Sequence, residues 1–201
     1  MPKTLSPADI EKFRARLCDV AEMQFAAHGP DGVTMRELAE ALGVSSMTPY
    51  RYFKDKDSIL AAVRTRAFNR FAAAMESAHS GRSEAGNAYL DFALANPAAY
   101  RLMFDVNQPT FADYPDLVAA MQRARLTMGD GLRIMAAAGS FKGDVELTAH
   151  VFWSAMHGAV MLELAGLLDG SHLNARQIAR PALQALMRAN GVPSIVEAAR
   201  P

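Results

Sequence analysis

Apolar residues recur three or four positions apart along almost the whole chain, which is the spacing of one face of an α-helix. No segment shows the strict alternation of a half-buried strand or a β-branched run between hairpin turns. The pattern therefore predicts an all-α protein with about nine helices. The expected helices cover residues 7–28, 34–43, about two turns from Ser45 or Ser46, 57–80, 85–95, 97–105, 116–138, 144–168 and 174–189.

The composition supports a compact core and argues against binding polyanions over the whole surface. Of 201 residues, 51% are apolar and 21% are charged, and 21 basic residues balance 21 acidic ones. The charge is uneven, because residues 45–70 hold six Lys or Arg against two Asp. Such a patch favours a local polyanionic partner, although a solvated helix face produces the same excess.

The chain begins without the basic start, apolar run and small-residue cleavage site of a secretory signal, so we expect a cytoplasmic protein. A single cysteine, Cys18, cannot form a disulfide within the chain. Residues 151–168 approach the length of a bilayer span, but His157 and Glu163 interrupt them. We expect instead a helix buried on several sides, as in a subunit interface, and no membrane partner.

Residues 34–56 fit two short helices joined by a tight turn. Thr34 is a good N-cap, and Glu37 is placed for a capping box. Ala39 lets two helices cross closely, and Gly43 adopts the left-handed backbone that a sharp turn requires. The second helix then presents a dense set of hydrogen-bonding side chains: Ser45, Ser46, Thr48, Tyr50, Arg51 and Tyr52. This pattern predicts a helix-turn-helix that enters the major groove of DNA, the alternative being an ordinary polar surface helix.

Catalytic and metal-binding motifs do not accompany this segment. The sequence has no Gly-rich phosphate loop, HExxH pair, GxSxG elbow or CxxC pair. His150 and His157 are about 10.5 Å apart along a helix, too far for a shared zinc ion. We therefore expect no enzyme activity, no metal and no cofactor. An all-helical cytoplasmic enzyme or small-molecule carrier with dispersed site residues is the alternative, and a constitutive DNA-architectural protein is a third.

The last two predicted helices are expected to form a dimer interface. Small residues along 144–168 permit close helix approach, and this helix is apolar on more than one face, whereas one domain covers only one. An intramolecular core is the competing interpretation. The expected interface residues are Ala155, Gly158, Ala159, Leu162, Ile178, Ala182, Leu183 and Leu186.

A further group of residues, rich in aromatic rings and thioethers, is suited to an apolar or aromatic small molecule. Ordinary core packing explains each member equally well, and a satisfied buried histidine explains His157. The expected ligand-binding residues are Tyr89, Phe92, Tyr100, Met103, Phe104, Met121, Met128, Trp153 and His157.

The order of these motifs resembles the TetR (tetracycline-repressor) family of transcriptional regulators. A first helix ending in Phe25 and Gly29 is followed by Thr34, by GVS at 43–45 and by YRYFKDK at 50–56. The resemblance implies a homodimer that binds a palindromic operator through a three-helix domain at residues 1–56. It also implies a helical domain at residues 57–201 that dimerises and binds a small effector, which releases this repressor from DNA.

The resemblance also implies roles for single residues. Thr34 matches a position that contacts a phosphate, Arg36 one that contacts the groove edge, and Lys56 a phosphate clamp, whereas Phe53 matches a core position. Tyr50 matches a phosphate contact. The matching recognition positions are Ser45, Ser46, Met47, Thr48, Tyr50 and Tyr52, with Ser46, Met47 and Thr48 nearest the bases.

The C-terminal half resembles a narrower group. Trp153, followed by His157 and Gly158, matches a subgroup named for tryptophan, histidine and glycine. The stretch NPAAYRLMF at 96–104 fits the same subgroup.

Overall fold

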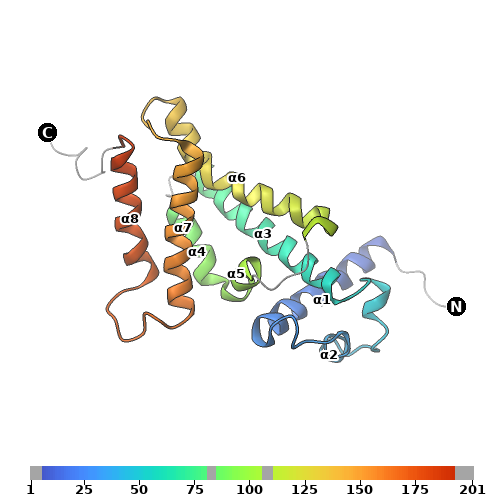
Figure 1. Cartoon of the computed structure of the whole chain (residues 1–201). Helices are drawn as coiled ribbons and strands as arrows, with labels where there is room; N and C mark the ends of the chain where they lie inside the picture. Colours follow the sequence, from blue (N-terminus) through green and yellow to red (C-terminus); the bar gives the residue numbers. More distant parts are fainter. Residues whose placement is uncertain (1–5, 81–84, 106–110, 193–201) are drawn as a thin grey trace. The chain divides into compact units, whose positions relative to one another are not determined.

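The computed structural model describes residues 6–80, 85–105 and 111–192. Within these ranges the chain is all-α, as predicted, with eight α-helices and no strand (Figure 1). None of the helices in these ranges combines the length and the apolarity needed to span a bilayer. Two short 3₁₀ helices are η1 (Pro49–Arg51) and η2 (Phe111–Asp113). The α-helices are α1 (Pro7–His28), α2 (Met35–Ala41), α3 (Lys56–Ser80), α4 (Ala85–Ala95), α5 (Pro97–Phe104), α6 (Pro115–Ala137), α7 (Val145–Leu164) and α8 (Ala175–Ala189).

The chain forms two compact units. The first contains the chain up to Asn69 together with Asn96–Met121, and the second contains Arg70–Ala95 and the chain from Gln122 onward. Helices α1, α2 and α5 therefore belong to the first unit, and α4, α7 and α8 to the second. Helices α3 and α6 each contribute residues to both units.

Side-chain caps fix where α1 and α2 begin in the first unit. The Ser6 hydroxyl accepts a hydrogen bond from the backbone N–H of Asp9 at 3.1 Å. Thr34 Oγ1 accepts from the N–H of Glu37 at 3.2 Å, and the Glu37 carboxylate accepts from the N–H of Thr34 at 2.7 Å. The predicted capping box at Thr34 is thus confirmed, and it satisfies amides that lack partners within the helix.

One hydrophobic core holds the helices of the first unit together. Its buried members come from α1, α2, α3 and α5, and from the connections before and after α2. They are Leu17, Cys18, Ala21, Phe25, Val33, Met35, Leu38, Phe53, Ile59, Leu60, Val63 and Leu102.

Helix α5 is fastened to this unit by a buried arginine as well as by apolar contacts. It packs against α1, and Leu102 is only 2% exposed. The guanidinium of Arg64, on α3, donates to the carbonyl oxygen of Met103 at 3.0 Å. Burial lowers the pKa of Arg64 to about 10, against the opposing attraction of Asp105, so the group stays a cation at neutral pH. The carbonyl groups at a helix C-terminus favour a cation, which accounts for this placement.

The predicted third helix, about two turns from Ser45, is not an α-helix. The N–H groups of Thr48, Arg51 and Tyr52 bond to carbonyls three residues earlier, at 2.8–3.1 Å, and only η1 forms. Pro49 explains the difference, because it has no N–H and its ring would clash with the carbonyl of Ser45 in an α-helix. Gly43, with φ of 68°, makes the predicted turn before this segment.

In the second unit, α7 packs against both α8 and α4 (Figure 1). Phe71, near the middle of α3, meets Tyr89 and Phe92 of α4 edge to face, with ring centroids 5.4 and 5.3 Å apart. Asp144 and Asn174 cap the N-termini of α7 and α8. The predicted helix 144–168 ends early, at Leu164, because the chain turns at Gly166, whose φ is 70°.

Candidate nucleic-acid interface

The segment between α2 and α3 is anchored to the core by its apolar side chains. Pro49 is buried, and Phe53, 5% exposed, lies in the core of the first unit, as predicted. The Arg14 guanidinium lies 4.0 Å from the centroid of the Phe53 ring. The Tyr52 ring stacks on Phe13 at 4.1 Å, and its carbonyl oxygen accepts from Arg14 at 2.5 Å. These contacts fix a surface segment that has little regular structure of its own.

Most residues predicted to bind DNA lie on the surface of this segment or at the start of α2. Tyr50 is 49% exposed and Met47 is 67% exposed. Thr48 is half-buried. The other exposed members of the predicted set are Thr34, Arg36, Ser45 and Ser46.

Two members of the predicted set are engaged within the protein. Tyr52 is half-buried through its stacking on Phe13. The Lys56 ammonium donates to the carbonyl oxygen of Pro30 at 2.6 Å. An ammonium has three N–H donors, so Lys56 can bind a phosphate oxygen while it keeps this bond. In Tyr52, by contrast, the stacking on Phe13 covers one face of the ring.

The basic patch over residues 45–70 is only partly directed at solvent. Arg64 is buried, Lys56 bonds to Pro30, and Arg66 bonds to Ala15 O at 3.0 Å and to the Asp19 carboxylate at 2.6 Å. The other basic side chains, Arg51, Lys54 and Arg70, are exposed. Arg51 and Lys54 flank the anchored Tyr52 and Phe53, so they are additional candidates for phosphate contacts. In the sequence, the excess of basic residues over 45–70 is the feature that points to Arg51 and Lys54.

The predicted ligand-binding residues are divided between the two units. Tyr100, Met103, Phe104 and Met121 belong to the first unit, where Tyr100 and Phe104 are in ring contact at 4.9 Å. The others belong to the second unit, where Tyr89 and Phe92 surround Phe71, and Met128 and Trp153 line one cleft: Tyr89, Phe92, Met128, Trp153 and His157. Several of these side chains, such as Tyr89 and Tyr100, are completely buried, as core residues are.

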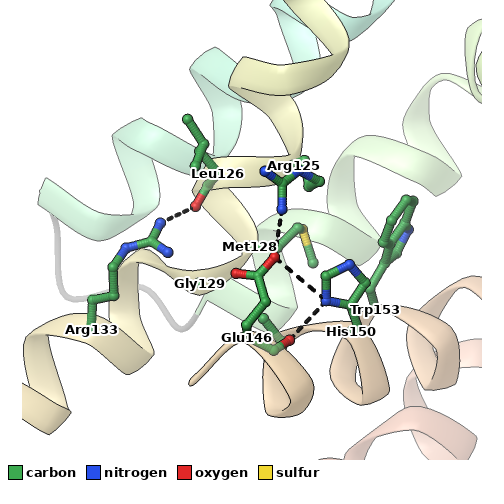
Figure 2. A pocket seen from close by; sticks show the side chains of 9 residues that line it. Arg125, Leu126, Met128, Gly129, Arg133, Glu146, His150 and Trp153 are labelled. Atoms are coloured by element: carbon green, nitrogen blue, oxygen red, sulfur yellow. Dashed lines mark hydrogen bonds and ion pairs between the residues drawn. The ribbon is translucent and has the colours of Figure 1, made fainter. Parts of the chain in front are cut away.

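A cleft between α6 and α7 is shown in Figure 2. Its volume is about 10 Å³, room for one water molecule, whereas small-molecule sites measure about 300–1,000 Å³. Two of its lining residues, Arg125 and Glu146, form an ion pair at 2.5 Å, and His150 Nδ1 lies 2.7 Å from the carbonyl oxygen of Glu146. The cleft therefore holds no effector-sized molecule in this conformation.

His157, half-buried on α7, makes stability depend on pH. Burial lowers its pKa below the ordinary 6.5, so the unfolded chain binds this proton more strongly than the folded chain does. Stability is then full above about pH 6.5 and falls as the pH drops below it. We expect His157→Asn to reduce this loss when urea unfolding is compared at about pH 7.5 and pH 5.5. His150→Asn, on an exposed position of the same helix, should keep the wild-type loss, and equal losses in both variants would contradict the assignment.

The residues predicted for the dimer interface differ in their exposure. Gly158, Leu162 and Ala182 are exposed, whereas Ala159 is buried within the unit. The remaining four are half-buried, and Leu183 faces α4, with its Cδ1 3.1 Å from the place of a Cβ at Gly86. The exposed face of α7 also carries large apolar side chains that were not in the predicted set: Leu147, Val151 and Met161.

Two family models match the chain. Residues 17–63 match the model of bacterial regulatory proteins of the tetR family. Residues 83–186 match that of the tetracyclin repressor-like C-terminal domain. The narrower likeness to the Trp-His-Gly subgroup stays a prediction.

Named relatives and solved structures agree with these matches. An uncharacterized HTH-type transcriptional regulator of Mycobacterium tuberculosis is 27% identical over 150 residues, which are 70% of this chain and 65% of the relative. The chain thus spans just under two thirds of that relative's length. A protein of unknown function from Rhodococcus sp. RHA1 is 26% identical with a TM-score of 0.77, over 95% of this chain and 99% of that one. The TetR-family regulator PfmR of Thermus thermophilus shares the fold, at 21% identity and a TM-score of 0.65, over 86% and 97% of the two chains. The chain therefore belongs to the TetR family of transcriptional regulators.

Proposed function

We propose that this protein is a cytoplasmic repressor that binds an inverted-repeat operator as a homodimer and is released by a small apolar or aromatic effector. Residues 1–56 supply the DNA contacts, and residues 57–201 supply the effector site and the dimer interface. The carrying observation is the anchored segment 45–52, which presents Ser45, Ser46, Met47 and Tyr50 to solvent. Family membership favours a regulator over the alternative of an all-helical enzyme or carrier.

The anchored segment 45–52, which we call the recognition segment, is so short that specific binding requires a dimer. With a single 3₁₀ turn, one copy reaches few bases, and a specific site needs two copies placed about 34–36 Å apart, one turn of duplex. Thr34 and Arg36 at the N-terminus of α2 add contacts to the backbone and the groove edge. Phosphate contacts of this kind position the protein, whereas base contacts select the sequence.

The exposed face of α7 supports a dimer through α7 and α8. Leu147, Val151, Gly158 and Leu162 recur at helical spacing and are exposed. Exposed apolar side chains aligned on one helix indicate an interaction surface. A Cβ at Gly158 would have no atom within 4 Å, so another helix can approach closely at this point. Ala182, exposed on α8, would widen the same interface.

The effector acts by preferring one dimer geometry. If it binds better when the recognition segments are too far apart or too close for the operator, it lowers DNA affinity by that preference, commonly about 1–3 kcal/mol. The aromatic and thioether residues of the predicted set favour an apolar or aromatic compound.

Selection of bound duplexes from a random pool tests this function. We expect an inverted repeat to be enriched, and its affinity to fall steeply as salt rises, because phosphate contacts release counterions. A screen for compounds that release the selected duplex then identifies the effector class. A purified dimer that enriches no duplex at low salt would contradict the proposal.

Tyr50→Ala and Lys56→Ala are expected to weaken operator binding. Loss of a hydrogen bond to a phosphate should cost at least about tenfold in affinity, since such charged bonds contribute about 1.5–3 kcal/mol. The slope of log affinity against log salt should fall by about 1 for Lys56→Ala, which removes a cation, and should stay unchanged for Tyr50→Ala, because a neutral hydroxyl displaces no counterion. Fluorescence anisotropy over a salt series measures both. Lys142→Ala, which removes an exposed lysine in the second unit, is the matched control and should bind as wild type. Wild-type affinity in both test variants would contradict the assigned contacts.

A further inference from the structure

Met47 places a large apolar side chain on the outer surface of the segment that we propose to face DNA. It is 67% exposed, and its exposed neighbours Ser45, Ser46 and Tyr50 all carry hydroxyl groups. A single exposed apolar residue needs no explanation by itself. The local backbone of Met47 is what makes this one informative.

Hydrogen bonds fix the turn from which Met47 projects. Ser45 Oγ accepts from the N–H of Met47 at 3.3 Å, and the Ser45 carbonyl accepts from the N–H of Thr48 at 2.8 Å. Pro49 follows at once, buried and with a φ fixed by its ring. Little backbone entropy is therefore lost when Met47 contacts a partner, which favours a specific contact.

The major groove offers one apolar group on its base edges, the C5-methyl group of thymine. Apart from the small C5–H of cytosine, the other edge groups are hydrogen-bond donors or acceptors, which a thioether cannot match well. The methionine side chain is flexible and polarizable, so it packs on a methyl group without strict geometry. Within residues 45–52 the exposed side chains are those of Ser45, Ser46, Met47, Tyr50 and Arg51, and Met47 alone among them carries no hydroxyl or charged group.

We propose that Met47 reads the methyl group of one thymine in each operator half-site and is thereby a specificity-determining residue. This inference rests on the proposed function, because it requires residues 45–52 to face the major groove. It adds a definite base preference, which neither the family nor the fold supplies.

Replacing thymine by uracil tests the contact, since uracil lacks only the methyl group. The probe is the duplex selected from the random pool. In each probe, the two thymines at equivalent positions of the two half-sites are replaced together, one such pair at a time. At one pair, wild-type affinity should fall about fourfold per half-site, the value of one buried methyl group. Met47→Ala should bind the thymine duplex correspondingly more weakly and should no longer distinguish uracil from thymine at that pair. Met47→Leu, which keeps an apolar side chain, should retain the distinction.

Met23→Ala is the matched control, because Met23 on α1 is also an exposed methionine, at 66%. It should keep the full wild-type response to uracil, and all three variants should unfold at the wild-type urea concentration. A wild type that ignores uracil at every pair would overturn the proposal. So would a Met47→Ala variant as sensitive as wild type, or a Met23→Ala variant that has lost the response.

These results are separable from a failure of the proposed function. Operator selection comes first, and enrichment of no duplex overturns both proposals. Enrichment of an inverted repeat that shows no Met47-dependent uracil response overturns the thymine contact alone.

Discussion

Gly158→Asp is expected to weaken the dimer by about 100-fold or more. A two-fold interface contains every substituted residue twice, and a charge buried there without a partner costs several kcal/mol. Within one chain the new side chain meets open space, because no atom lies within 4 Å of its Cβ. The monomer should therefore fold, and sedimentation velocity at micromolar concentration should show monomers where the wild type shows dimers.

Ala119→Asp is the control for the added charge. Ala119 is exposed on α6 and lies in the first unit. Placed four residues before Arg123, the new carboxylate has a favourable helical neighbour. This variant should remain dimeric and keep operator affinity, whereas Gly158→Asp should lose both. A Gly158→Asp protein that sediments as a dimer, like the wild type, would contradict the proposed place of α7 in the interface. A monomeric wild type would contradict the proposal that the effector acts through the geometry of the dimer.

Phe53→Ala is expected to lower the free energy of unfolding by about 3–5 kcal/mol, the usual cost of truncating a buried phenylalanine. The ring is 5% exposed, belongs to the core of the first unit and lies under the Arg14 guanidinium at 4.0 Å. Whole domains are stable by only about 5–15 kcal/mol, so this one cavity removes much of the reserve. Operator binding should be lost with it, because Phe53 anchors the recognition segment.

Urea unfolding followed by circular dichroism measures this effect, with all variants at one protein concentration because dimerisation adds to stability. Tyr50→Ala is the paired control, since Tyr50 is 49% exposed in the same segment. Its unfolding free energy should stay within about 0.5 kcal/mol of wild type while its DNA affinity falls. The two variants thus separate anchoring from contact. Equal stabilities for both would show that Phe53 does not anchor the segment.

Features set by local chemistry were predictable from the sequence. The Thr34–Glu37 capping box and the turn at Gly43 each depend on a few neighbouring residues, and both are present. The sequence predicts a helix of about two turns from Ser45 or Ser46, although Pro49 lies within this segment. A proline is tolerated in the first turn of an α-helix but not further along it. Around Pro49 the backbone forms 3₁₀ hydrogen bonds in place of a longer α-helix.

Features set by distant partners were not predictable. No local pattern indicates that Lys56 bonds to the carbonyl of Pro30, or that Arg64 reaches Met103. The predicted ligand-binding residues show the same difficulty. Aromatic and thioether side chains give the same sequence pattern whether they line a pocket or fill a core. Exposure on α7 could be read only from the fold, which shows that Ala159 faces inward while its neighbour Gly158 faces solvent.

Helix α5 limits how this regulator can be recombined with others. By sequence it falls inside the C-terminal family match at 83–186, yet Leu102 completes the hydrophobic core around α1, and Met103 receives the Arg64 bond. A chimera that grafts the first 69 residues onto a foreign sensor would leave the place of Leu102 empty and the buried Arg64 charge without that carbonyl. An incomplete core and a buried cation that has lost a hydrogen-bond acceptor both lower stability, and a small domain has little stability to lose. The unit that we propose to read DNA is therefore discontinuous in the chain, and an interchangeable version must carry Asn96–Met121 with it.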